Sequence, residues 1–248
     1  MNKKLNVLGV AATLAMSIGY TGMAQAATVT TSGTWTSAVG TQSPIGGIGT
    51  NQISWGTAAT GNGQSGYNFT GESNVTAPLN GSSFLLGTFT HFNWPITGNT
   101  LANANLGVNF TGAFNKTFNF AFSHNETPNN VPGTVCPATP GYSEPCPDVV
   151  SIPSLSSTEL VSIGGFDYNL TIEGFKPDAS SSPVSQFITI EQRANSAGLY
   201  GKLVQVQATP PSPNVPEPMT ILGSATALVF GGVLKRKQSQ AQKEKVNA

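Results

Sequence analysis

The sequence predicts an all-β protein, an antiparallel β-sandwich of the jelly-roll type. In several runs between residues 27 and 208, apolar and polar side chains alternate one by one, whereas helical periodicity is scarce. Such alternation is typical of a strand with one face in the core and the other in water. Clusters of Gly, Asn and Ser separate the runs, as tight turns require. Many short strands with such turns favour two packed antiparallel sheets.

The predicted strands follow one another along the second half of this region. The run TFNFAFSH aligns Phe118, Phe120 and Phe122 on one face of a strand. The run GFDYNLTIEGF alternates in the same way, with Phe166 and Tyr168 at the start of its apolar face. Three more predicted strands are LGVNF at 106–110, SQFITIEQ at 185–192 and KLVQVQA at 202–208.

The charge of this region excludes one class of partner. Residues 27–208 contain four basic and nine acidic side chains, a net charge of −5. Nucleic acids are bound through clustered Lys and Arg, so we expect no nucleic-acid partner. The length suits one domain with a sizeable core, which we place at 27–208.

The N-terminal residues have the pattern of a secretory signal peptide. Lys3 and Lys4 precede an apolar stretch from Leu5 to Ile18, and Ala24-Gln25-Ala26 forms a small-x-small cleavage site. We therefore assign residues 1–26 to a signal peptide that signal peptidase removes.

The C-terminal residues predict a single, short membrane helix. A proline-rich spacer at 209–218 precedes an apolar stretch at 219–234, and a basic cluster with a polar tail follows at 235–248. A helix of this length reaches roughly 24 Å, less than the ~30 Å hydrocarbon core. The basic cluster is expected to stay cytoplasmic, with the rest of the chain outside. Its members are Lys235, Arg236 and Lys237.

These C-terminal features together resemble the PEP-CTERM sorting signal. The resemblance rests on Val215, Pro216, Glu217 and Pro218, followed by the apolar stretch and the basic cluster. It implies that an exosortase, an integral-membrane cysteine protease, recognises the Pro-Glu-Pro motif and processes the chain. It also implies transient anchoring in the inner membrane of a Gram-negative-type bacterium, and then delivery to the cell surface or extracellular matrix.

The two cysteines of the chain predict one disulfide. Cys136 and Cys146 bracket a proline-rich segment, and an exported chain meets an oxidising compartment. We expect the whole stretch from Thr127 to Pro153 to be a long ordered loop that the disulfide holds.

A second resemblance comes from the run THFNWPI. Thr90, His91 and Asn93, with Pro95 after them, resemble the signature of the THxN family of PEP-CTERM proteins, which is related to extracellular domains called choice-of-anchor. The resemblance covers most of residues 27–208 and implies an extracellular domain, but no particular activity. In a strand, Leu85 and Phe89 would share the face of His91.

The candidate ligand or metal residues are His91, His124, Glu126 and Asp148. Histidine and carboxylate side chains are metal ligands, and these residues would meet at one sheet end if the strands of His91 and His124 were neighbours. Two alternatives stay open. In the first, His91 is a buried histidine whose hydrogen bonds are made by the backbone and Asn93. In the second, oxygen atoms around Glu126 and Asp148 bind calcium, which prefers oxygen ligands. No other cofactor is expected.

The sequence favours a non-catalytic surface or matrix protein, with exopolysaccharide or biofilm association as its role. Uncharged strand faces rich in Thr and Asn offer hydrogen bonds to sugar hydroxyls. The alternative is a secreted polysaccharide hydrolase or lyase, which needs a pair of carboxylates at the scissile bond. The chain has no Gly-x-Ser-x-Gly, no His-Glu-x-x-His and no phosphate-binding loop, so we expect no enzyme.

Overall fold

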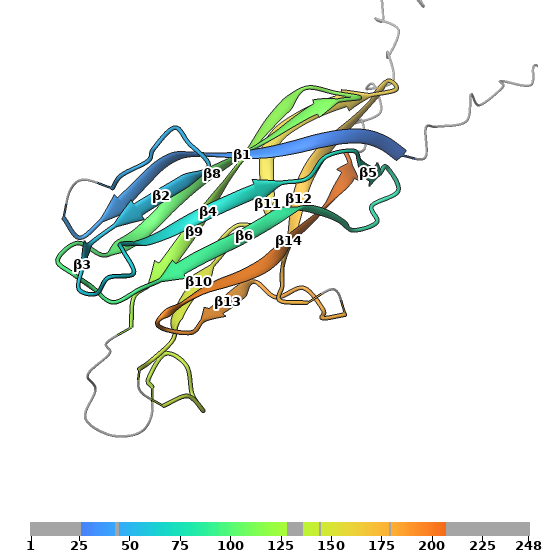
Figure 1. The fold of residues 1–248 in the computed structure, drawn as a ribbon. Coiled ribbons are helices and arrows are strands. Elements are labelled where there is room, and N and C mark those ends of the chain that lie inside the picture. Colours follow the sequence, from blue (N-terminus) through green and yellow to red (C-terminus); the bar gives the residue numbers. More distant parts are fainter. Residues whose placement is uncertain (1–25, 43–44, 128–135, 144, 179, 207–248) are drawn as a thin grey trace, which may run out of the picture. The chain divides into compact units, whose positions relative to one another are not determined.

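The structure, a computed structural model, describes residues 26–42, 45–127, 136–143, 145–178 and 180–206 (Figure 1). All of them belong to one of two compact units in the chain, Met1–Val206; the other unit, Gln207–Ala248, lies outside the described residues. The described residues form strands, turns and bends, without a helix. The predicted all-β class is therefore confirmed.

Two six-stranded antiparallel sheets make up the fold, and their strands run diagonally across Figure 1. The first sheet has the order β13 (Gln186–Thr189), β10 (Asp148–Ser151), β9 (Lys116–Asn125), β8 (Leu101–Gly112), β1 (Ala26–Gly40) and β5 (Val75–Pro78). The second has the order β11 (Ser156–Ile163), β12 (Phe166–Lys176), β14 (Arg193–Gln205), β6 (Phe84–Asn93), β4 (Ser65–Gly71) and β2 (Gln52–Trp55). A small separate pair joins β3 (Thr57–Ala58) to β7 (Ile96–Thr97).

The two sheets pack face to face over one aromatic core. Phe89 of β6 stacks on Phe122 of β9 with the ring planes 1° apart and the centroids 5.6 Å apart. Trp35 of β1 lies 5.5 Å from Tyr67 of β4, centroid to centroid. Each of these pairs joins one sheet to the other, and all four side chains are buried. Burial of such large apolar surfaces is the main source of stability in a fold of this kind.

A glycine lets the two sheets approach each other closely. Gly33 lies on the inward face of β1, and a Cβ atom there would be 2.3 Å from Cδ1 of Phe69. That distance is far below van der Waals contact, so a side chain at this position would displace the Phe69 ring. The absence of a side chain thus makes room for a buried aromatic ring of the opposite sheet.

An irregularity in β6 determines which residues share the face of His91. In the pairing with β14, Leu199 lies opposite Gly87 and Tyr200 lies opposite Leu85. Leu86 of β6 therefore has no partner residue on β14 and forms a bulge. Leu86 is consequently buried, and Leu85 is only partly buried. The prediction that Leu85 shares the face of His91 is wrong, because a bulge shifts the alternation by one residue.

Two other expectations need correction at the strand ends. Phe166 was expected on the buried face of its strand, but it is 38% exposed at the first position of β12, beside the turn. The segment from Thr127 to Pro153 is not all loop, because β10 forms within it and pairs with both β9 and β13. A sequence as short as DVVS has too little alternation to predict a strand.

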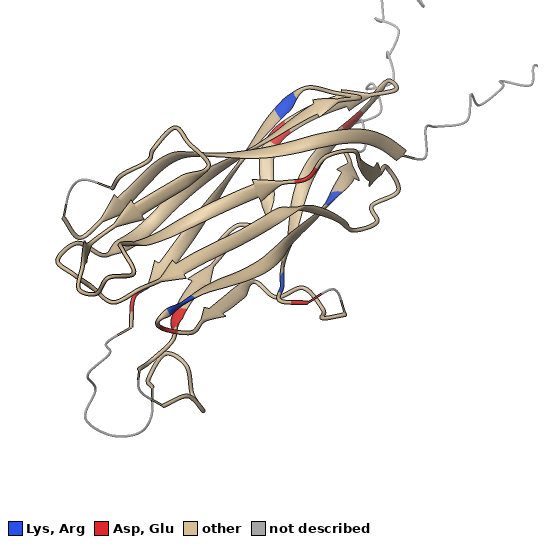
Figure 2. Cartoon of the chain, viewed as in Figure 1, with Lys and Arg blue, Asp and Glu red and all other residues tan. Residues whose placement is uncertain are grey.

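Charged side chains are sparse on the sheets and lie mainly near the strand ends and edges (Figure 2). One ion pair on the second sheet joins Lys202 Nζ to Glu173 Oε1 at 3.1 Å. The outward faces of the two sheets therefore carry mainly uncharged residues, many of them Thr, Asn and Ser.

Candidate metal centre

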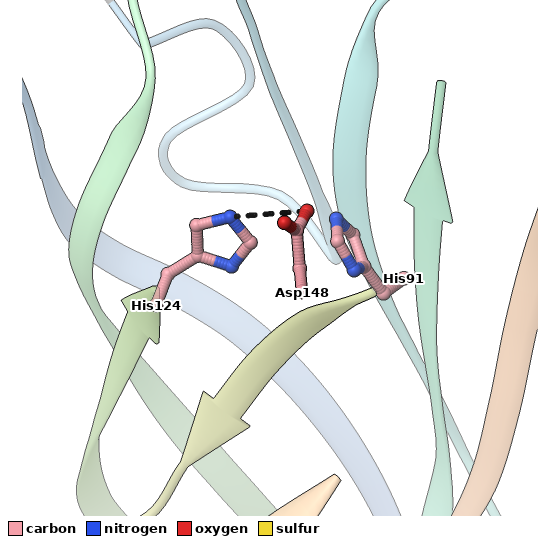
Figure 3. Close-up of side chains that lie close together, drawn as sticks. All are labelled: His91, His124 and Asp148. Atoms are coloured by element: carbon pink, nitrogen blue, oxygen red, sulfur yellow. Dashed lines mark ion pairs between the residues drawn. The ribbon is translucent and has the colours of Figure 1, made fainter. Parts of the chain in front are cut away.

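Three buried side chains with metal-ligating atoms meet in the core (Figure 3). His91 belongs to β6 of the second sheet, whereas His124 belongs to β9 and Asp148 to β10 of the first sheet. One ligand atom from each residue lies within 4.8 Å of those of the other two. The predicted candidates thus come together, but the two histidines meet across the two sheets and not on neighbouring strands of one sheet.

The strand register places Asp148 beside His124. β10 pairs with β9 so that Val150 lies opposite His124. Asp148 is two residues before Val150 and therefore points to the same side of the sheet, into the core. Val150 and Asp148 are both fully buried. The β10 strand, which was not predicted, is the element that brings the carboxylate to the site.

His91 has one satisfied and one unsatisfied ring nitrogen. Its Nδ1 lies 2.8 Å from Oγ1 of Thr189, and this hydroxyl donates its own hydrogen to the backbone oxygen of Asp148 at 3.3 Å. With its own hydrogen on that backbone oxygen, the Thr189 hydroxyl can accept from His91, and this arrangement corresponds to the tautomer with the proton on Nδ1. His91 Nε2 is buried and has no hydrogen-bond partner. Burial, and after it the neighbouring His124, holds the pKa of His91 well below its usual range.

Both ring nitrogens of His124 have polar neighbours. Nδ1 lies 2.6 Å from the Tyr67 hydroxyl, and Nε2 lies 3.2 Å from Oε2 of Glu126 and 3.8 Å from Oδ2 of Asp148. Burial, and then the nearby charges of Asp148 and Glu126, raises the pKa of Tyr67 well above its usual value. The tyrosine is therefore a neutral hydroxyl at physiological pH.

The two carboxyl oxygens of Asp148 have different surroundings. Oδ1 accepts a hydrogen bond from the backbone N–H of Thr127 at 2.7 Å. Oδ2 is buried without a hydrogen-bond partner and faces His124. Burial is the main reason that the pKa of Asp148 rises to about 9; Glu126 and Glu191 add to the rise, and Thr127 opposes it. An ionised carboxylate here needs a compensating positive charge.

Aromatic rings enclose the two imidazoles. The Trp55 ring stacks on His91 at 5.7 Å with the planes 22° apart, and it meets His124 edge-on at 5.4 Å. Tyr67 also contacts both imidazoles edge-on. Trp55, Tyr67 and His91 are fully buried, so the site has a low-dielectric wall. Electrostatic interactions in such surroundings are stronger than in water.

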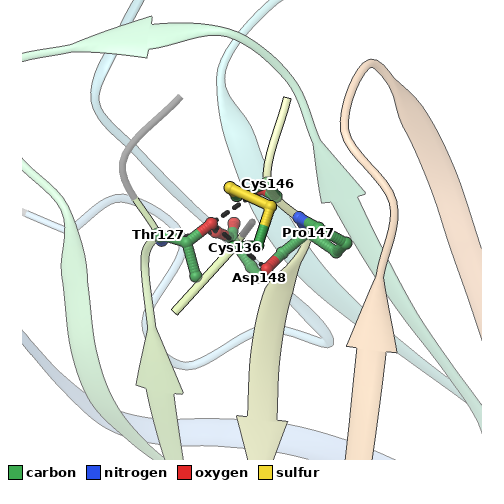
Figure 4. The surroundings of a disulfide bond; sticks show 5 residues. All are labelled: Thr127, Cys136, Cys146, Pro147 and Asp148. Carbon is green, nitrogen blue, oxygen red and sulfur yellow. Dashed lines mark hydrogen bonds between the residues drawn. A yellow bond between two sulfur atoms is a disulfide. The ribbon is translucent and has the colours of Figure 1, made fainter. Parts of the chain in front are cut away.

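The disulfide lies next to the site along the chain (Figure 4). Cys136 and Cys146 are bonded, as predicted, and both are buried. The Thr127 hydroxyl lies 2.7 Å from the backbone oxygen of Cys146 and 3.1 Å from that of Pro147. Asp148 follows Pro147 directly. The disulfide and the hydrogen bonds of Thr127 therefore hold the backbone that positions the Asp148 side chain.

The other residues of the THxN-like motif surround the site without all entering it. Thr90 faces outward, and its hydroxyl lies 2.8 Å from that of Ser196. The Asn93 side chain is buried and donates from Nδ2 to the backbone oxygen of Thr189 at 3.0 Å. Pro95 follows the strand, and its backbone oxygen accepts from the N–H of Ala59. The expectation that Asn93 satisfies His91 is wrong, because Thr189 takes that role.

Sequence reasoning missed Thr189, Tyr67 and Trp55 as parts of this site. Tyr67 and Trp55 lie on β4 and β2, which have only weak alternation, and Thr189 lies at the end of β13. The contacts of Thr189 with His91 and Asn93 bridge almost a hundred residues of chain. Only the packing of one sheet on the other brings β13 and β6 together, and no local pattern carries that information.

The arrangement offers two imidazoles and one or two carboxylates in the interior of the core. This donor set can hold a cation, or it can remain a buried hydrogen-bonded cluster. Substrate access is poor, because His91 and Asp148 are fully buried and only the Glu126 side chain, 20% exposed, reaches towards solvent.

The predicted sorting residues lie outside the described residues. This applies to the motif at 215–218, to the apolar stretch at 219–234 and to the basic cluster at 235–237. Within the part of the chain that is described, no helix is long and apolar enough to cross a bilayer. Comparison with protein-family models and with curated proteins finds no match to this chain.

Proposed function

We propose that this chain is an exported, non-catalytic protein of the cell surface or extracellular matrix of a Gram-negative-type bacterium. In this proposal, signal peptidase removes residues 1–26, the helix at 219–234 holds the chain in the inner membrane, and an exosortase then recognises Pro216-Glu217-Pro218. The exported part is a jelly-roll-like β-sandwich of the THxN type that associates with exopolysaccharide.

The observation that carries the proposal is the buried disulfide between Cys136 and Cys146. Disulfides persist in oxidising compartments and are rare in the cytosol. The described residues contain no free cysteine, so the bond uses both thiols of the chain. The signal-peptide pattern at 1–26 supports the same conclusion independently.

A shallow groove on the second sheet supports the association with polysaccharide. Phe92 and Trp94, both partly exposed, line it together with polar side chains. The polar members are Gln52, Ser54, Asn62 and Gln64. Aromatic rings next to amide and hydroxyl groups suit sugar rings, which have both apolar faces and hydroxyl edges. The lining has no carboxylate, whereas a glycosidase needs two at the scissile bond, so this groove favours binding over hydrolysis.

The sorting signal is tested by replacing Glu217 and Pro218 with alanine in a host that has an exosortase. We expect the variant to stay in the membrane fraction at the size of the unprocessed chain, because the extended Pro-Glu-Pro conformation and its charge are lost. The matched control replaces Ser212 and Pro213, two spacer residues outside the motif. Release of the motif variant at the wild-type rate and size would contradict the proposal.

A further inference from the structure

We propose that His91, His124 and Asp148 bind a divalent transition-metal cation in the core, with Glu126 as the fourth ligand. This inference stands apart from the proposed export and polysaccharide binding, because it rests only on the described side chains. It concerns a structural centre that joins the two sheets.

The first argument is the orientation of the His91 lone pair. Nε2 is buried without a hydrogen-bond partner, and in the tautomer whose Nδ1 proton Thr189 accepts, Nε2 carries a lone pair that no donor satisfies. A buried unsatisfied acceptor is costly, and structures rarely keep one without a reason. Metal-bound histidines typically donate the other ring N–H to a neighbouring oxygen, as His91 does here.

The second argument is the matching arrangement at His124. The Tyr67 hydroxyl at 2.6 Å can accept the Nδ1 proton, just as Thr189 does for His91. In that tautomer, which a bound metal requires, the Nε2 lone pair faces the carboxylate oxygens of Glu126 and Asp148. Without a cation, Nε2 can instead carry the proton and donate it to Glu126; a cation takes the place of that proton and is held by the Nε2 lone pair and the carboxylate oxygens together. A divalent cation would also neutralise both carboxylates and leave the buried site without net charge.

The third argument is the distance between the ligand atoms. Zn²⁺ binds nitrogen and oxygen at about 2.0–2.2 Å, so tetrahedral ligand atoms lie about 3.4 Å apart. His124 Nε2 is 3.2 Å from Glu126 Oε2 and 3.8 Å from Asp148 Oδ2. The widest separation among the buried three is within 4.8 Å. A contraction of roughly 1 Å, within reach of side-chain rotation, completes the geometry.

The ligand types select the class of metal. Two imidazole nitrogens with one or two carboxylates suit Zn²⁺ and its first-row neighbours. Calcium takes six to eight oxygen ligands, and the two nitrogens here take the place of oxygens. The closed surroundings fit a structural metal, because a catalytic one keeps a coordination position open to substrate.

The direct test observes the imidazoles themselves. The chain has only two histidines, so ¹⁵N-histidine labelling of the full-length protein gives four ring-nitrogen signals. The protein is purified through a histidine-free tag, stripped with a chelator and titrated with Zn²⁺. We expect both Nε2 signals to shift and saturate at one equivalent, with protons on both Nδ1 atoms in the metal-bound protein. Unchanged imidazole signals in folded protein would overturn the proposal.

Variants that are expected to fold without the metal can locate the site. Asp148→Asn keeps an oxygen for the Thr127 N–H and removes the buried charge, so it should fold without metal. We expect Asp148→Asn and His91→Gln each to weaken Zn²⁺ binding more than about 100-fold. Loss of a residue that only hydrogen-bonds to a ligand costs roughly 10–100-fold. Chelation should lower the melting temperature of the wild type and leave that of Asp148→Asn unchanged.

The control is Glu173→Gln, which removes a carboxylate that pairs with Lys202 on the second sheet. It should bind Zn²⁺ as the wild type does. Wild-type affinity in Asp148→Asn or His91→Gln would place the metal elsewhere and refute the assignment. Saturation of the site by Ca²⁺, with no response to Zn²⁺, would refute the choice of a transition metal.

Discussion

Removal of the disulfide is expected to destabilise the domain by an amount that follows from its loop. Cys136 and Cys146 are ten residues apart in sequence and both are fully buried. On the chain-entropy model, closing a loop of this length stabilises the fold by about 2.7 kcal/mol, because the cross-link restricts the unfolded chain. For a domain of this size the melting temperature should fall by about 5–11 °C.

The double variant Cys136→Ala/Cys146→Ala is the suitable perturbation, because alanine leaves no polar group in the core. Equilibrium unfolding in urea can be followed through the fluorescence of Trp35 and Trp55, which are both fully buried. Reduction of the wild type with a thiol should reproduce the loss, and the same reductant should not affect the double variant. A difference in unfolding free energy under about 1 kcal/mol would refute the reasoning, since the loop would then restrict the unfolded chain little.

Two further outcomes concern the candidate site and the groove. Thr189→Val should lower Zn²⁺ affinity roughly 10–100-fold in titrations of folded protein, because His91 loses the oxygen that accepts its Nδ1 proton; unchanged affinity would exclude Thr189 as a positioning residue. Trp94→Ala should weaken binding to the matrix polysaccharide about tenfold or more, as expected for loss of an aromatic contact worth about 1.4 kcal/mol or more. The control is Phe166→Ala, which removes an exposed aromatic ring outside the groove lining and should bind a polysaccharide array as the wild type does. Release of reducing ends from the polysaccharide by the wild type would instead indicate an enzyme.

The sequence predicted the strands whose inward positions are all apolar. Phe118, Phe120 and Phe122 of β9 are buried, as their alternation indicated. β1 gave no such signal, although it is the longest strand described. Its inward positions include Thr31, whose hydroxyl donates to the backbone oxygen of Leu86, and Gly33, which makes room for an aromatic ring. Inward residues chosen for a hydrogen bond or a close approach do not produce hydrophobic alternation.

The candidate site could be predicted as a set of residue types and not as a geometry. His91 and His124 were identifiable because they are the two histidines of the chain, whereas Asp148 was one of nine acidic side chains in residues 27–208. Their convergence depends on three facts that only the folded chain reveals. These are the packing of β6 against β9 across the core, the formation of β10, and the bulge at Leu86 that sets the face of His91.

The position of β14 determines how much of the chain must be present before the second sheet can be completed. This strand is the last of those described, and it lies in the interior of its sheet between β12 and β6. β6 is made about a hundred residues earlier and must wait for it with one edge unpaired. A chain that ends before Arg193 therefore lacks an inner strand of the second sheet. The unpaired edges of β6 and β12 would make such a chain prone to aggregate.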